Sequence, residues 1–135
     1  MKIYIAASSK EIDRACRIMQ SLRAMGHEIT EDWTERMRRV GVPDAEVSFE
    51  ILNEARIANE EGILACDAFV FLAGPASFGT GYETCYALQD DLARRDAGFP
   101  CKLLVLVGAV TNCFHTVFDY VYAGDDELLS AARLW

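Results

Sequence analysis

The clearest structural signal in this chain is the run Cys66-Asp-Ala-Phe-Val-Phe-Leu72, which continues as Ala73-Gly-Pro-Ala-Ser-Phe-Gly-Thr-Gly-Tyr-Glu83. Its first part is a short apolar run ended by a Gly-Pro pair, which predicts a buried β-strand. Beyond the glycine-rich loop, residues 84–95 carry apolar side chains at the spacing of one helix face, at Cys85, Leu88 and Leu92. The stretch therefore predicts a strand, a loop and a helix, with Glu83 in the first turn of the helix.

A loop of this kind is suited to bind an anion. The first backbone N–H groups of a helix have no partner within the helix and carry positive partial charge, so a phosphate finds donors there. From these residues alone a structural interpretation is equally open. In that interpretation the glycines serve the geometry of a tight turn, and Glu83 is a surface residue compatible with the helix dipole.

Size and composition predict a single globular domain over residues 1–135. The chain is 52% hydrophobic and 25% charged, which is typical of a folded protein with its own core. It shows no apolar run of membrane-spanning length and no signal-peptide pattern, so we expect a cytoplasmic protein without a membrane partner. The net charge of −8 argues against a nucleic acid polymer as partner. A small anionic ligand remains compatible with that charge.

Five cysteines are spread along the chain without a CxxC pair, and the two histidines lie far apart in sequence. This pattern matches no known metal-ligand spacing, so we expect no metal and no cofactor. Three cysteines fall on faces that we predict to be buried, where cysteine acts as a small hydrophobic residue: Cys66, Cys85 and Cys101.

Strand-forming runs alternate with helical patterns along the chain. The predicted strands are residues 2–7, 27–30, 66–72, 101–107 and 117–122, the last as an edge strand. The predicted helices begin after a cap at Ser8 or Ser9, at Pro43-Asp44, in the glycine-rich loop, and at a cap at Asp125. We expect the second of them to bury a stripe of Val47, Ile51, Ala55 and Ala58.

This order predicts a three-layer, doubly wound α/β fold on a mostly parallel five-stranded sheet of the flavodoxin or Rossmann kind. In the flavodoxin-like strand order, the first and third strands are neighbours, and ligands bind beyond their carboxyl ends. Residues 4–10 would then lie opposite residues 74–83. A tyrosine, two serines, a lysine and the Glu83 carboxylate would meet in one crevice.

In these features the chain resembles the nucleoside 2-deoxyribosyltransferase superfamily, including its branch of 2'-deoxynucleoside 5'-monophosphate N-glycosidases. The resemblance follows the element order of nearly the whole chain. It is carried by Tyr4 in the first strand, the Ser8-Ser9-Lys10 turn, and Ser77-Phe-Gly-Thr-Gly-Tyr-Glu83 followed by Ala87-Leu88. It implies that Glu83 is the nucleophile that attacks the anomeric carbon of the sugar. It also implies that Tyr4 helps to hold this glutamate.

The same resemblance favours a nucleotide as substrate. Family members that act on free nucleosides have an aspartate at the position of Ser77, whereas the nucleotide hydrolases have a serine that contacts the 5'-phosphate. A serine and a basic residue in the first turn, like Ser8 and Lys10, also belong to the hydrolase pattern. Hydroxyl groups, backbone donors and a cation suit a phosphate. The implied binding set also includes Ala7, Ser9 and Gly79.

One position departs from the family pattern. The family usually has an acidic residue eight positions before Asp67, whereas this chain has Asn59, followed by Glu60 and Glu61. Asparagine forms hydrogen bonds but cannot act as a general acid. Three consequences are open: Glu60 substitutes for it, activity is reduced, or the protein binds a nucleotide without turnover. We expect Asp67 itself to be structural, bonded to nearby backbone.

Other residues have two interpretations each. Trp33 would either stack on a base or pack in the core. Arg38 and Arg39 would either close over the site or form a solvated face, the interpretation that we favour. By analogy with the family we expect a homodimer or higher homo-oligomer, in which Asn112 reaches the ligand of the neighbouring subunit.

The expected function is therefore that of an N-glycosidase, which cleaves the base–sugar bond of a (2'-deoxy)nucleoside 5'-monophosphate through a glutamate nucleophile. One alternative is a nucleoside 2-deoxyribosyltransferase that exchanges bases on free deoxynucleosides. Another is a non-catalytic module that binds or senses nucleotides, which Asn59 keeps open. In each case the ligand is a small nucleotide or nucleoside.

Overall fold

The computed structural model describes residues 1–40, 47–75, 77–111 and 113–135. Its strands are β1 (Lys2–Ala6), β2 (Glu28–Ile29), β3 (Ala68–Leu72), β4 (Leu103–Val107) and β5 (Tyr120–Tyr122). Its α-helices are α1 (Ile12–Ala24), α2 (Trp33–Val40), α3 (Phe49–Ala65), α4 (Phe78–Asp96) and α5 (Asp125–Ala132). Two short 3₁₀ segments, η1 (Ser9–Glu11) and η3 (Cys113–Val117), follow β1 and precede β5. The expected alternation of strands and helices is confirmed.

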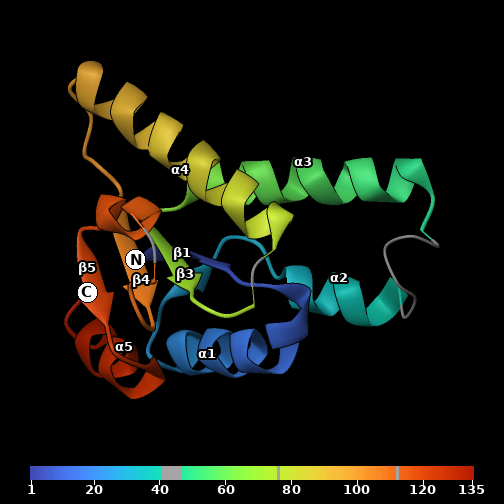
Figure 1. Cartoon of the computed structure of the whole chain (residues 1–135), viewed down its shortest axis with the longest axis horizontal. Helices are drawn as coiled ribbons and strands as arrows, with labels where there is room; N and C mark the ends of the chain where they lie inside the picture. The colour runs from blue at the N-terminus through green and yellow to red at the C-terminus, as the bar shows by residue number, and fades with distance from the viewer. Residues whose placement is uncertain (41–46, 76, 112) are drawn as a thin grey trace.

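The five strands form one sheet in the order β2-β1-β3-β4-β5, and each neighbouring pair is parallel. This is the flavodoxin-like order that we predicted, with an all-parallel sheet where we expected a mostly parallel one. Helices α1 and α5 lie on one side of the sheet, and α3 and α4 lie on the other (Figure 1). The first and third strands are therefore neighbours, which is the condition for the predicted site.

The central strands form because their apolar runs are covered on both faces, as is usual in parallel sheets. The fully buried side chains of the core include Ile3, Ile5, Phe69, Val70, Val105 and Leu106. Helix α1 ends before Gly26, whose φ of 90° is a conformation that favours glycine. The Ser8 hydroxyl accepts from the backbone N–H of Lys10 at 3.4 Å, so this predicted cap precedes η1 rather than α1.

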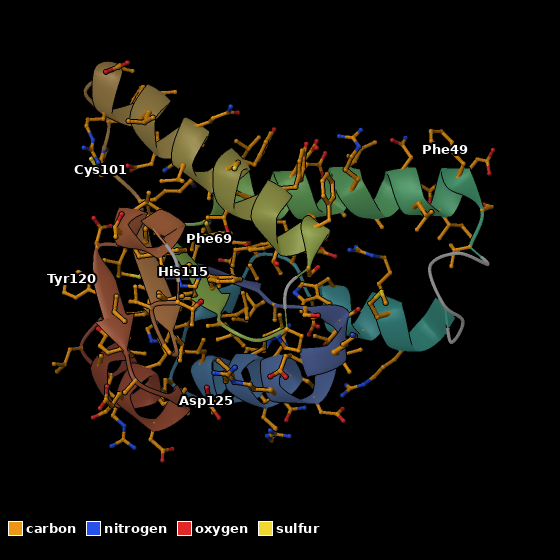
Figure 2. The ribbon with its side chains drawn as sticks, in the orientation of Figure 1. Phe49, Phe69, Cys101, His115, Tyr120 and Asp125 are labelled. Atoms are coloured by element: carbon orange, nitrogen blue, oxygen red, sulfur yellow. The ribbon has the colours of Figure 1, made fainter. Side chains whose placement is uncertain are left out.

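Helix α3 differs from its prediction. Its N-cap is Ser48, whose hydroxyl accepts from the backbone N–H of Ile51 at 3.4 Å, whereas the predicted start at Pro43-Asp44 lies outside the described residues. Val47 precedes the helix, Ile51 is 44% exposed, and Ala55 and Ala58 are only half-buried, so the predicted buried stripe is wrong. The residues that α3 buries are Gly62 and Ile63. Figure 2 shows the cause, since Phe49 marks the end of α3 that projects beyond the sheet.

Helix α4 begins at Phe78, earlier than the first apolar residue of its predicted face. Glu83 consequently lies in the second turn of the helix, and the predicted position in the first turn is wrong. The predicted buried face is wrong at two of its three residues, since Cys85 is exposed and Leu92 is 55% exposed, whereas half-buried Leu88 packs against the core. The side chains that α4 buries are small or polar and lie on a neighbouring face: Thr80, Ala87 and Asp91.

Two further predictions are corrected. Asp125 is the first residue of α5 and not its cap, and its carboxylate accepts hydrogen bonds from Arg14 at 2.7 and 2.9 Å. Cys101 precedes β4 and is exposed, whereas Cys66 is buried as predicted. None of the helices in the described ranges combines the length and the apolarity that a membrane crossing requires.

Candidate functional site

The turns that follow β1 and β3 meet at the carboxyl edge of the sheet. Strands β1 and β3 are parallel, with Ala6 opposite Phe71, so both strands end at the same edge of the sheet. A methyl group added at Gly74 would lie 3.0 Å from Cγ of Glu11, which places the two turns in direct contact. Arg14 also donates to the backbone carbonyl of Ala73 at 2.9 Å. The predicted meeting of the first and third turns is confirmed.

A hydrogen-bonded triad of side chains is centred on Glu83. The hydroxyl of Tyr4 donates to Oε1 of Glu83 at 2.9 Å, and Nδ2 of Asn59 donates to the same oxygen at 2.9 Å. The three residues come from β1, α4 and α3, so the fold brings together side chains that are far apart in sequence. Tyr4 is fully buried and stacks on Phe69 with a centroid distance of 5.8 Å. The carboxylate thus has a fixed orientation.

Burial determines the protonation of the two acidic groups. Removal from solvent raises the pKa of Glu83 to about 7, and the hydrogen bonds from Tyr4 and Asn59 and the positive charge of Arg36 oppose this effect. Burial and the neighbouring carboxylate raise the pKa of Tyr4 well above its ordinary value. Tyr4 is therefore a neutral donor at physiological pH, and Glu83 changes its charge near neutrality.

The two oxygens of Glu83 have different surroundings. Oε1 accepts both hydrogen bonds of the triad, whereas no side chain or backbone group in the described part of the chain donates to Oε2. A carboxylate oxygen with free lone pairs is a nucleophile, and the bonds to its partner oxygen hold it in place. Hydrogen bonds therefore fix the position of one oxygen, and the other could act chemically on a bound ligand.

Arg36 was not among the residues predicted for the site. The side chain of Arg36 on α2 donates to Oδ1 of Asn59 at 2.5 Å and forms an ion pair with Glu31. The segment showed only an excess of arginine, and the direction of α2 decides which arginine turns inward. Arg38, two residues later, pairs instead with Asp13 and is exposed, in agreement with a solvated face.

The residues expected at the phosphate lie around the two turns. Ser8 and Ala7 are buried at the end of β1, while Ser9 and Lys10 are exposed on η1. Ser77 is the N-cap of α4 but makes no capping hydrogen bond with its hydroxyl. Exposed Gly79 lies next to it, because a methyl group added there would be 3.7 Å from the Ser77 hydroxyl. The hydroxyl and the first backbone N–H groups of α4 thus face no capping group.

The remaining predicted residues fall into three cases. Trp33 is buried, and its Nε1–H donates to the carbonyl of Ile5 at 2.7 Å, which matches the core interpretation. Asn112 lies outside the described residues, and so does the side chain of Arg39. Asp67 accepts from the backbone N–H of Lys2 at 2.9 Å, which confirms its structural role.

Glu60 does not take the place of Asn59. Its carboxylate accepts hydrogen bonds from Arg56 and Tyr82, both at 2.5 Å, and these bonds lower its pKa. Asn59, one residue earlier on α3, is the side chain that contacts Glu83. The described residues contain no group of three or more His, Cys, Asp or Glu side chains placed to hold a metal ion.

The fold and the site define a flavodoxin-like α/β protein with a partly buried glutamate that is hydrogen-bonded to β1 and α3. Neither a protein-family model nor a curated protein gives a significant match to the sequence. Among solved structures, the chain has the fold of the CMP N-glycosidase BcmB from Clostridium botulinum, with 20% identity, a TM-score of 0.63 and complete coverage of both chains. It also has the fold of a 2-deoxyribosyltransferase from Bacillus psychrosaccharolyticus, with 19% identity, a TM-score of 0.62, and coverage of 96% of this chain and 90% of the other.

Proposed function

We propose that this protein belongs to the nucleoside 2-deoxyribosyltransferase superfamily and is an N-glycosidase of (2'-deoxy)nucleoside 5'-monophosphates. The observation that carries the proposal is the double hydrogen bond to Oε1 of Glu83 from Tyr4 and Asn59, while no donor within the described ranges contacts Oε2. The likeness of the fold to a CMP N-glycosidase and to a 2-deoxyribosyltransferase supports glycosidic chemistry. The residues that carry the resemblance lie on β1, in the turn that follows β1, and in and just before α4.

In the proposed mechanism, Oε2 of ionised Glu83 attacks C1' of the sugar while the bond between C1' and the base nitrogen breaks. The electron pair of that bond leaves with the base, through a transition state of oxocarbenium character. Water then attacks C1' and gives one proton to solvent, and the ester bond to Glu83 breaks to release the sugar phosphate and the carboxylate. Asn59 has no acidic proton to give, so the departing base takes its proton from solvent or from another donor.

The 5'-phosphate would bind where the two turns meet. Ser8, Ser77 and the backbone N–H groups at the start of α4 offer donors, and the exposed ammonium of Lys10 offers positive charge. Ala7, Ser9 and Gly79 line this region through their backbone in the proposed complex. The Ser77 hydroxyl makes no capping hydrogen bond to α4, although a serine at an N-cap commonly does, and this favours its use for the phosphate.

A product assay tests the proposal. The protein is incubated with four deoxynucleotides and four ribonucleotides, and release of free base is followed by chromatography. Glu83→Ala should abolish the release in a folded protein, with Glu61→Ala on α3 as the matched control. Release that persists in Glu83→Ala would overturn the assignment of the nucleophile.

Two observations favour other functions. The likeness to a 2-deoxyribosyltransferase favours base exchange, and a second free base in the assay would then yield a new nucleoside. The amide of Asn59 beside the carboxylate favours a non-catalytic nucleotide-binding or sensing module. Tight binding across the nucleotide panel without release of base would select that function.

We also propose that the protein self-associates. Its proposed location is the cytoplasm. The outer faces of α3 and α4 expose apolar side chains at Phe49, Ile51, Leu52, Ile57, Leu64, Phe78, Tyr82 and Leu92. These exposed apolar side chains on two neighbouring helices are suited to burial against a second copy. Analytical ultracentrifugation should find a homodimer or higher oligomer, which Leu92→Glu weakens. A monomer at all concentrations would contradict this.

A further inference from the structure

The hydrogen bond between Asn59 and Arg36 determines which side-chain atom of Asn59 faces Glu83. An asparagine side chain presents an oxygen that accepts and a nitrogen that donates. The guanidinium of Arg36 donates only, and its NH2 group lies 2.5 Å from Oδ1 of Asn59. The oxygen must therefore face α2, and this turns Nδ2 toward Oε1 of Glu83 at 2.9 Å.

The side chain of Arg36 is held in position by Glu31. Its guanidinium forms an ion pair with Glu31, and the two side chains are only 25% and 22% exposed. The close approach of Glu31 to α3 depends on Gly62, one turn after Asn59, because a methyl group added there would lie 2.7 Å from Cβ of Glu31. The same added group would lie 3.1 Å from the ring of Tyr4. Gly62 therefore lies beside Tyr4, which donates to Glu83 directly, and beside Glu31, which pairs with the arginine that contacts Asn59.

We infer that Arg36 is a positioning residue of this site: with Glu31 behind it, its guanidinium fixes the side-chain amide of Asn59 so that Nδ2, and not Oδ1, faces the Glu83 carboxylate. Without Arg36 the amide is free to rotate by half a turn, and Oδ1 would then repel the carboxylate. The catalytic consequence rests on the function proposed above, whereas the orientation of the amide does not.

The position of Arg36 and of the Asn59 amide also affects the pKa of Glu83. The groups that face it are Tyr4 from β1, Asn59 from α3 and the cation of Arg36 from α2, which Glu31 partly neutralises. Arg36 and the amide both favour the ionised carboxylate and lower its pKa. Their loss should therefore move the acid limb of the pH profile to higher pH.

The test uses NMR and steady-state kinetics on the full chain. In the wild type, the Asn59 side-chain amide resonances, assigned by their loss in Asn59→Ala, should shift as Glu83 titrates near pH 7. Arg36→Met, which keeps the length of the side chain and removes its donors, should abolish most of this shift. It should also lower kcat by about ten-fold or more with little change in KM, because a misaligned group acts on the transition state. Arg36→Lys should restore part of both.

A double-mutant comparison identifies the route of the effect. If Arg36 acts through Asn59, then Arg36→Met causes no further loss of kcat in the Asn59→Ala background. Arg38→Met, which removes an exposed arginine of the same helix, is the matched control and should leave the amide resonances and kcat unchanged. If Arg36→Met does not fold, Glu31→Gln gives the same test with a smaller shift.

Three results have separate meanings. Asn59 resonances that titrate unchanged in a folded Arg36→Met protein would overturn the inference. An equal loss of kcat with and without Asn59 would also overturn it, because Arg36 would then act directly. A wild type that releases no base would refute the proposed function alone, and the NMR titration would still decide the role of Arg36.

Discussion

Replacing Glu83 with glutamine should make the protein more stable at alkaline pH. Burial raises the pKa of Glu83 to about 7 in the folded protein, whereas solvent surrounds it in the unfolded chain, where its pKa returns to its ordinary value of 4.5. Between these two values the folded state keeps a proton that the unfolded chain has lost. The free energy of unfolding therefore falls as the pH rises through this window.

The size of the effect follows from the two pKa values. Each pKa unit corresponds to about 1.36 kcal/mol, so the wild type should lose about 3 kcal/mol of stability above about pH 8. Most of this loss, about 2.5 kcal/mol, falls between about pH 5 and about pH 8.5. Glutamine keeps the shape and an oxygen that accepts from Tyr4 and Asn59, but it does not titrate.

Urea unfolding of the wild type and of Glu83→Gln at both pH values measures this difference. The comparison across pH cancels the part of the substitution's effect that does not depend on protons, including any change in packing. Glu61→Gln replaces an exposed glutamate on α3 and should follow the wild type. If Glu83→Gln and the wild type show the same pH dependence, the carboxylate is solvated in the folded protein. The reasoning from burial would then be refuted.

Three other predictions concern the same site. The kcat/KM for base release should rise with pH and level off above about pH 7, because only ionised Glu83 attacks; a flat profile from about pH 5 to 9 would contradict this. Gly62→Ala should lower the free energy of unfolding by about 1–2 kcal/mol and reduce kcat, because the added methyl group meets Glu31 and Tyr4. Thermal unfolding and steady-state kinetics measure the two effects, and an unchanged protein would argue against the close contact. Trp33→Phe should lower the free energy of unfolding by about 1–3 kcal/mol, because it leaves the backbone carbonyl of Ile5 without its donor. The KM should change little, and a large rise in KM would instead indicate that Trp33 stacks on the base.

The central part of the fold was predictable because its signals are local and strong. Residues 66–72 and 101–107 are nearly continuous apolar runs, and burial on both faces leaves them few alternatives to a central parallel strand. Once the strands alternate with helices, right-handed crossovers leave few strand orders. The neighbourhood of Tyr4 and Glu83 then follows from the topology, although their hydrogen bond was expected only from the resemblance.

The outer helices were harder to predict, for a physical reason. Apolar spacing identifies a face that avoids water, but it does not say whether the sheet or another molecule covers it. Leu92 and Ile51 lie on such faces and are exposed, because α3 projects past the sheet and α4 turns Ala87 inward instead. Small residues allow a helix to approach the sheet closely, yet they contribute little to a hydrophobic pattern.

Position 59 shows how one departure from a family pattern changes the electrostatics of its neighbours. A carboxylate at this place would accept from Arg36 and put a second negative charge beside Glu83, which raises the pKa of a buried carboxyl group. Asparagine accepts from the same arginine and donates to Glu83, so the charge of Arg36 is not cancelled at that point. An asparagine at this position removes a possible proton donor and at the same time favours the ionised form of Glu83. A site built in this way is suited to attack on C1' and leaves the protonation of the departing base to another group.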